Sequence, residues 1–185
     1  MSVVDLRSLQ RQFLNAHIKE GGTVVDFTMG NGHDTAWLAE AVGEGGHVYA
    51  FDIQKQAVEN TRARLSSLGL LERCTLFCTS HEHVLDYVKE PICVGVFNLG
   101  WLPGSDKTLR THHISTKKAV EGAISLCSHD GIVLIAVYPG HEEGEVEGDM
   151  LSEMLATLDK QAFSVSKFRL INSPTAPYFF AVEKV

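Results

Sequence analysis

Hydrophobic and polar positions follow two different periods along this chain, and segments of the two kinds alternate. Apolar residues three and four positions apart, typical of a helix with one buried face, mark residues 6–18, 37–42, 57–68, 119–127 and 146–158. Short, nearly continuous apolar runs, typical of strands buried on both faces, mark residues 23–28, 47–52, 74–80, 92–99 and 131–139. This alternation predicts an α/β fold, with a parallel sheet covered by helices on both faces.

The end of the chain departs from this alternation. Two apolar runs, residues 163–171 and 177–185, are separated only by NSPTA, which is too short for a crossover helix. We therefore expect an antiparallel hairpin at one edge of a seven-stranded, mostly parallel, Rossmann-like sheet, all in one domain over residues 1–185. Leu68 and Val146 are expected on buried helix faces, and Ser115 is expected to cap a helix.

Composition narrows the classes of function. The 185 residues, 44% of them hydrophobic, suit one domain with a full core, and no apolar run approaches the ~20 residues that span a bilayer. The first residues carry charges and include no apolar region of the kind found in a signal peptide, so we expect a cytoplasmic protein. The net charge of −7 argues against a protein that coats nucleic acid by bulk electrostatics. The four cysteines and nine histidines lack metal-site spacing, so we expect reduced core cysteines and no metal.

Candidate chemistry gathers where the first two strands end. Gly30 and Gly32 follow Asp26 and allow a tight turn before a helix, and twenty residues after Gly32 the second strand ends in Asp52. Nucleotide and S-adenosylmethionine sites share such a turn and a distant acid that can bind a ribose diol. Thr35 stands where a dinucleotide fingerprint needs a small residue. A carboxylate at Asp26 would crowd a pyrophosphate but suits the cationic amino-acid part of S-adenosylmethionine.

The third and fourth strand ends extend this site. Ser80 and His81 close the third strand, where adenine contacts are expected, although His81 equally suits a plain surface cap. The fourth strand ends in Asn98-Leu99-Gly100-Trp101, which is similar to the [ND]-P-P-[YF] motif of amino-group methyltransferases. An Asn oxygen and the carbonyls after it can orient the lone pair of an amine for in-line methyl transfer, while an aromatic ring stacks on a base.

Charged groups after the fourth and fifth strands suggest further roles. Asp106 and His141 are candidate proton acceptors for an alkylamine that is mostly protonated at neutral pH, and each is equally compatible with a structural role. A basic group with no acid between its members suits RNA phosphates: Lys107, Arg110, Lys117 and Lys118.

Four segments carry a resemblance to a known family: DFTMGNGHDT, FDIQ, NLGWLPGSDK and YPGHEEGEVE. They resemble the YtqB/MnmM family of class I S-adenosylmethionine-dependent methyltransferases, long labelled rRNA methylases, over nearly the whole chain. The resemblance implies methylation of 5-aminomethyluridine at the tRNA wobble position, with the anticodon stem-loop as partner. Trp101 stands where tyrosine is usual, and Ser105 stands where a second glycine is common.

The family pattern places the methyl donor or the acceptor amine against Asp26, Gly30, Gly32, Asp52, Gln54 and Asn98. Neighbouring members of the same segments complete the expected donor site: Thr28, Asn31, Asp34, Thr35 and Ile53.

Other functions stay open at this point. The acceptor could be an rRNA base or a small-molecule amine. A nicotinamide-dependent oxidoreductase on the same architecture is a second alternative, but the sequence has no recognisable Tyr-x-x-x-Lys pair. A non-catalytic partner protein is a third, but such a protein would not need the acidic strand ends. Since a small enzyme needs a second surface to hold a stem-loop, we expect a homodimer.

Overall fold

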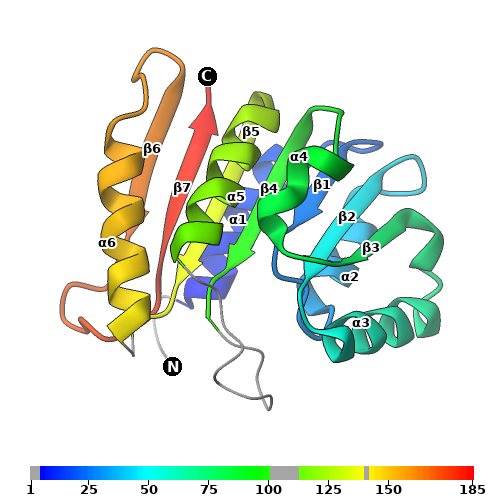
Figure 1. Cartoon of the computed structure of the whole chain (residues 1–185). Helices are drawn as coiled ribbons and strands as arrows, with labels where there is room; N and C mark the ends of the chain where they lie inside the picture. Colours follow the sequence, from blue (N-terminus) through cyan, green and yellow to red (C-terminus); the bar gives the residue numbers. More distant parts are fainter. Residues whose placement is uncertain (1–4, 101–112, 140–141) are drawn as a thin grey trace.

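One sheet organises the chain, and its strands lie in the order β3-β2-β1-β4-β5-β7-β6. The computed structural model describes residues 5–100, 113–139 and 142–185. The strands are β1 (Thr23–Asp26), β2 (His47–Asp52), β3 (Cys74–Cys78), β4 (Ile92–Asn98), β5 (Cys127–Val137), β6 (Phe163–Phe168) and β7 (Tyr178–Lys184). Strands β1 to β5 pair in parallel, whereas β7 lies antiparallel between β5 and β6. The predicted mostly parallel sheet with a C-terminal hairpin is confirmed (Figure 1).

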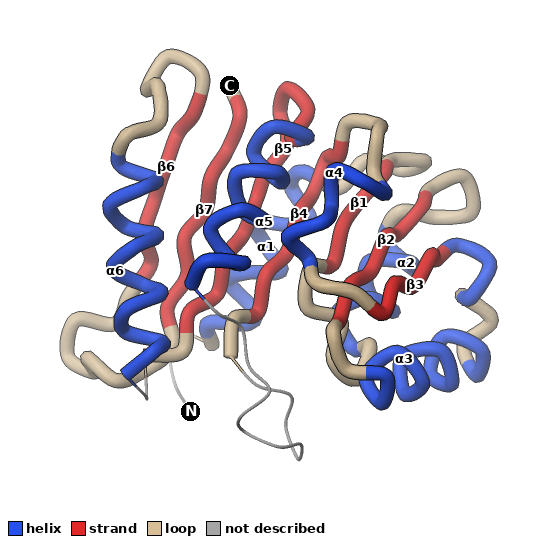
Figure 2. Tube along the Cα trace, in the orientation of Figure 1, coloured by secondary structure: helices blue, strands red, loops and turns tan. Residues whose placement is uncertain are grey.

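Helices cover both faces of this sheet (Figure 2). They are α1 (Leu6–His17), α2 (His33–Ala41), α3 (Lys55–Ser67), α4 (Val84–Tyr87), α5 (His113–Leu126) and α6 (Glu142–Ala156). Residues of α4, α5 and α6 share one core with Val25 and Phe97, while residues of α1, α2 and α3 share the other with Val24 and Val96. Because successive strand residues face opposite sides, both neighbours on a strand are buried, which explains the continuous apolar runs.

The strand order places the candidate site. The chain first builds the sheet outward from β1 to β3 and then returns to place β4 on the other side of β1. In such sheets ligands bind at the carboxyl ends of the strands, where the order reverses. In Figure 1, β4 runs downward to that edge and β7 runs back upward from it. The ends of β1, β2 and β4 therefore lie together.

Several local expectations are wrong. Helix α5 already begins at His113, so Ser115 lies inside its first turn and does not cap it. Strand β5 begins at Cys127, because Cys127 pairs with Ile92 before the register shifts. Leu68 and Val146 are 51% and 46% exposed, and the Cys78 thiol is exposed.

Two short 3₁₀ helices, η1 (Leu71–Arg73) and η2 (His81–His83), and the single turn of α4 had no sequence prediction. Their length is too short to show a periodicity. Within the described ranges, no helix is long and apolar enough to cross a membrane.

Candidate active site

The Asp26 carboxylate lies fully buried at the end of β1. Its Oδ1 accepts a hydrogen bond of 3.1 Å from the Thr28 backbone N–H, and its Oδ2 accepts one of 2.7 Å from the Thr35 hydroxyl on α2. Burial and the neighbouring charge of Asp34 nevertheless raise the pKa of Asp26 to about 7. This carboxyl therefore ties the strand end to the following helix and changes charge near neutral pH.

The glycine turn after β1 depends on the absence of side chains. Gly32 ends the turn at φ +75° and forms the N-cap of α2. A Cβ atom there would lie 2.8 to 2.9 Å from atoms of Thr61 on α3. The Thr61 hydroxyl donates a hydrogen bond of 2.9 Å to the Gly30 carbonyl, so α3 packs directly against the turn. A residue with a Cβ at Gly32 would be strained and would push this helix away.

Asn31 faces α3. Its side-chain oxygen accepts a hydrogen bond of 2.9 Å from the Asn60 amide, and its carbonyl accepts one of 2.8 Å from Arg64 Nε. These bonds hold the outer side of the glycine turn. No local pattern pointed to Arg64, because the turn and the arginine are far apart along the chain.

Asp52 holds the next strand end beside this turn. Its Oδ2 accepts a hydrogen bond of 3.1 Å from the Gly30 N–H, and its Oδ1 accepts one of 2.9 Å from the N–H of Gln54, the N-cap residue of α3. Burial raises the pKa of Asp52. Ile53 is 52% exposed beside it and offers apolar surface at the same edge. The carboxylate and the isoleucine together suit a ribose diol and an adjoining base.

His81 is buried, so a plain surface cap is the wrong interpretation of this residue. Its Nδ1 lies 3.1 Å from the Phe27 carbonyl, and its ring packs edge-on against Phe97 at 5.8 Å between centroids. A carbonyl only accepts, so Nδ1 carries the hydrogen. Burial lowers the pKa of His81, which favours the neutral ring. The histidine thus locks η2 onto the end of β1.

Asn98 ends β4 next to these groups. Its backbone N–H donates a hydrogen bond of 2.7 Å to Thr28 Oγ1, and its side-chain Nδ2 donates one of 3.0 Å to Asp34 Oδ2. Leu99 is buried and its N–H bonds to the Ala136 carbonyl at 3.0 Å, so the Leu99 side chain packs in the core and leaves only backbone for a substrate. Gly100 has φ +143°, a conformation that favours glycine.

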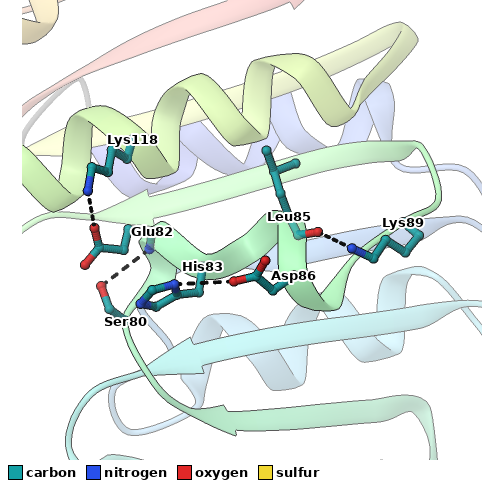
Figure 3. A network of polar contacts seen from close by, with 7 residues as sticks. All are labelled: Ser80, Glu82, His83, Leu85, Asp86, Lys89 and Lys118. Atoms are coloured by element: carbon teal, nitrogen blue, oxygen red, sulfur yellow. Dashed lines mark hydrogen bonds and ion pairs between the residues drawn. The ribbon is translucent and has the colours of Figure 1, made fainter.

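The basic residues of α5 differ in their surroundings. Lys117 is exposed. Lys118 Nζ lies 3.2 Å from Glu82 Oε2 and links the N-terminal half of α5 to η2, whose N-cap is Ser80 (Figure 3). This hydrogen bond lowers the pKa of Glu82. The Glu82 contact was not predicted, because the two residues are 36 positions apart.

Other predicted residues lie outside the described ranges: Trp101, Asp106, Lys107, Arg110 and His141. Within those ranges, no group of three or more His, Cys, Asp or Glu side chains is arranged to hold a metal ion.

The sheet order, the glycine turn and the acidic strand ends define the class I methyltransferase fold. Residues 48–184 match the family described as "Putative rRNA methylase", so the chain belongs to that family. A crystal structure from Clostridium thermocellum, described in the same terms, aligns over 100% of both chains with a TM-score of 0.96 and 35% identity. A Streptococcus mutans structure in complex with SAH does so with a TM-score of 0.91 and 31% identity.

A curated relative adds a closer functional comparison. The chloroplastic tRNA (mnm(5)s(2)U34)-methyltransferase of Arabidopsis thaliana is 36% identical over an alignment of 170 positions that covers 86% of this chain. The chain spans 62% of the length of that relative.

Proposed function

We propose that this protein is an S-adenosylmethionine-dependent methyltransferase that acts on RNA, and that its acceptor is the primary amine of 5-aminomethyluridine at the tRNA wobble position. The observation that carries the proposal is the placement of Asn98. This amide lies at the end of β4, hydrogen-bonded to Asp34 of α2 and beside the acidic ends of β1 and β2. A methyl-accepting amine bound there would adjoin the donor site.

The donor set fits S-adenosylmethionine chemically. The ligand is cationic, and the carboxylates of Asp26 and Asp52 adjoin the glycine turn. Asp52 would hold the ribose hydroxyls, and the exposed face of Ile53 would contact the adenine. When bound, S-adenosylmethionine supplies an electrophilic methyl group on a sulfonium centre whose sulfur leaves as a neutral thioether.

The acceptor side orients the amine. With its Nδ2 committed to Asp34, Asn98 offers Oδ1 as an acceptor for one N–H of the amine, and the backbone carbonyls after β4 can accept another. The nitrogen lone pair then forms the new bond to carbon as the carbon–sulfur bond breaks, and one proton must leave the nitrogen. Asp106 and His141 are the proposed acceptors of that proton.

An exposed lysine and the descriptions of related proteins support RNA as the substrate. Lys117 lies exposed near the start of α5, the helix that leads away from the candidate site. The Arabidopsis relative carries tRNA position 34 in its name, whereas the family description names rRNA. An experiment must therefore compare both kinds of RNA.

The test is methyl transfer from labelled S-adenosylmethionine, followed by nucleoside mass spectrometry. The substrates are tRNA carrying wobble 5-aminomethyluridine, the same tRNA without the aminomethyl group, and ribosomal RNA. The proposal expects one added methyl, on the first substrate alone. Transfer to ribosomal RNA alone, or to tRNA regardless of the aminomethyl group, would refute the wobble amine as acceptor.

A further inference from the structure

We propose that Asp34 is a positioning residue for methyl transfer, because its carboxylate sets which end of the Asn98 side-chain amide faces the acceptor amine. The inference rests on the proposed function and deepens it. It assigns to Asp34 a role distinct from contact with the methyl donor.

The argument begins with hydrogen-bond polarity. Asp34 Oδ2 lies 3.0 Å from Asn98 Nδ2. An ionised carboxylate only accepts hydrogen bonds, and an amide oxygen cannot donate one. The NH₂ end of Asn98 must therefore face Asp34, and Oδ1 must face the opposite direction. With the amide rotated by half a turn, Asn98 Oδ1 would face Asp34 Oδ2 at about the same separation. The NH₂ group of Asn98 would then face the acceptor amine, whose N–H groups are donors as well.

Hydrogen bonds hold the main chain on both sides of the Asn98 side chain. The backbone N–H of Asn98 is fixed by Thr28 Oγ1 at 2.7 Å, and the Leu99 N–H is fixed by the Ala136 carbonyl. The main chain at the end of β4 is thus anchored to Thr28, two residues beyond the end of β1, and to β5. Within the described ranges, the hydrogen bond to Asp34 is the contact that distinguishes the oxygen of the Asn98 side chain from its nitrogen.

Asp34 is itself held on a rigid element. It lies in the first turn of α2, where the helix dipole favours a negative charge, and the next residue, Thr35, binds the buried Asp26. Asp34 is half-buried, and a hydrogen bond to an ionised group in such a position is stronger than one in water. The Asp34–Asn98 contact crosses 64 residues of sequence and couples the donor-side turn to the acceptor-side strand.

The test exchanges the two side chains. Asp34→Asn, Asn98→Asp and the double variant Asp34→Asn/Asn98→Asp are assayed for kcat and KM with aminomethylated tRNA. In the double variant, the amide now at position 34 donates to one oxygen of the carboxylate now at position 98, and the other oxygen remains as acceptor. Asn98→Asp alone sets two carboxylates about 3 Å apart and should lower kcat at least about 100-fold.

The expected result is a reversal of sign. Asp34→Asn should lower kcat about 3- to 10-fold in the wild-type background, yet raise it at least about 10-fold in the Asn98→Asp background. The affinity for S-adenosylmethionine, measured by calorimetry, should change less than about 3-fold in Asp34→Asn. Asp86→Asn, which removes a carboxylate that is 73% exposed on α4, is the control and should leave kcat unchanged.

Other outcomes overturn the assignment. A large loss of donor affinity in Asp34→Asn at unchanged kcat would make Asp34 a donor ligand. If the double variant binds the donor and unfolds at the wild-type temperature but shows no rescue of kcat, the positioning role of Asp34 is refuted. The proposed function is not affected by that result. An inactive wild-type enzyme on aminomethylated tRNA would instead overturn the proposed function and this inference with it.

Discussion

The buried carboxyl of Asp26 should make the protein less stable as the pH rises from about 5 to 7, and Asp26→Asn should abolish that loss. The substitution keeps the local shape. The new amide can accept from the Thr28 N–H through its oxygen and donate through its nitrogen to the Thr35 hydroxyl, which rotates to accept. It removes only the ionisation that burial and the charge of Asp34 oppose.

The magnitude follows from linkage. The pKa of Asp26 is about 7 in the folded protein against an ordinary value of 3.8. Below pH 3.8 the carboxyl is protonated in both states, and its contribution to stability is complete. Between these two values the unfolded chain has released the proton that the folded chain retains, so each pH unit favours unfolding by about 1.4 kcal/mol. Because the folded state begins to release its own proton near pH 7, the wild type should lose about 2 kcal/mol from pH 5 to 7, and the loss levels off above that.

The assay is urea unfolding of both proteins, followed by circular dichroism at four pH values from about 5 to 8. Other titrating groups cancel in the difference between the two free energies of unfolding. That difference should move in favour of the variant by about 2 kcal/mol between pH 5 and 7. A difference independent of pH would show that the hydrogen bonds from Thr28 and Thr35 keep Asp26 ionised throughout, which refutes the reasoning.

Three further perturbations test other parts of the site. Asn98→Ala should lower kcat about 100-fold in steady-state methyl transfer while changing the donor dissociation constant less than about 3-fold; equal losses in both would move Asn98 away from the reacting amine. In tRNA binding, Lys117→Ala should flatten the plot of log affinity against log salt by about 0.7 to 0.9, whereas the ion-paired Lys118→Ala should flatten it less. Gly32→Ala should lower the free energy of unfolding by about 2 to 4 kcal/mol. Gly69→Ala, at a similar φ of +70° with nothing within 4 Å of a Cβ, should cost only about 1 kcal/mol, and equal losses would remove the clash from the explanation.

The sequence alone predicts those features that depend on the spacing of apolar residues within a short segment. Strands buried on both faces produce runs such as the one ending at Asn98, and a short connection excludes a crossover helix. The glycine turn and the acids at Asp26 and Asp52 were predicted because each stands at a fixed offset from a strand end. Parallel strands then bring those ends to one edge whatever the details of packing.

The contacts between distant segments could not be predicted in this way. Nothing local relates Asp34 to Asn98, 64 residues away, and the pairing exists because α2 and β4 both adjoin the end of β1. His81 shows the same limit. Its neighbours in the sequence, Glu82 and His83, are polar, yet η2 turns the ring inward to Phe27.

Under the proposed function, the acidic strand ends also bear on turnover and on how an acidic protein can bind RNA. Methyl transfer converts a sulfonium into a neutral thioether, so the ligand beside the carboxylates at the ends of β1 and β2 loses one positive charge when the reaction occurs. They should therefore bind the methyl donor more tightly than the demethylated product, which favours product release. Asp26 is fully buried and Asp52 accepts two backbone N–H groups, so their charges are held inward, while Lys117 is exposed on α5. In the proposed function the acidic strand ends bind the methyl donor and the exposed lysine binds RNA, so a net charge of −7 is compatible with an RNA substrate.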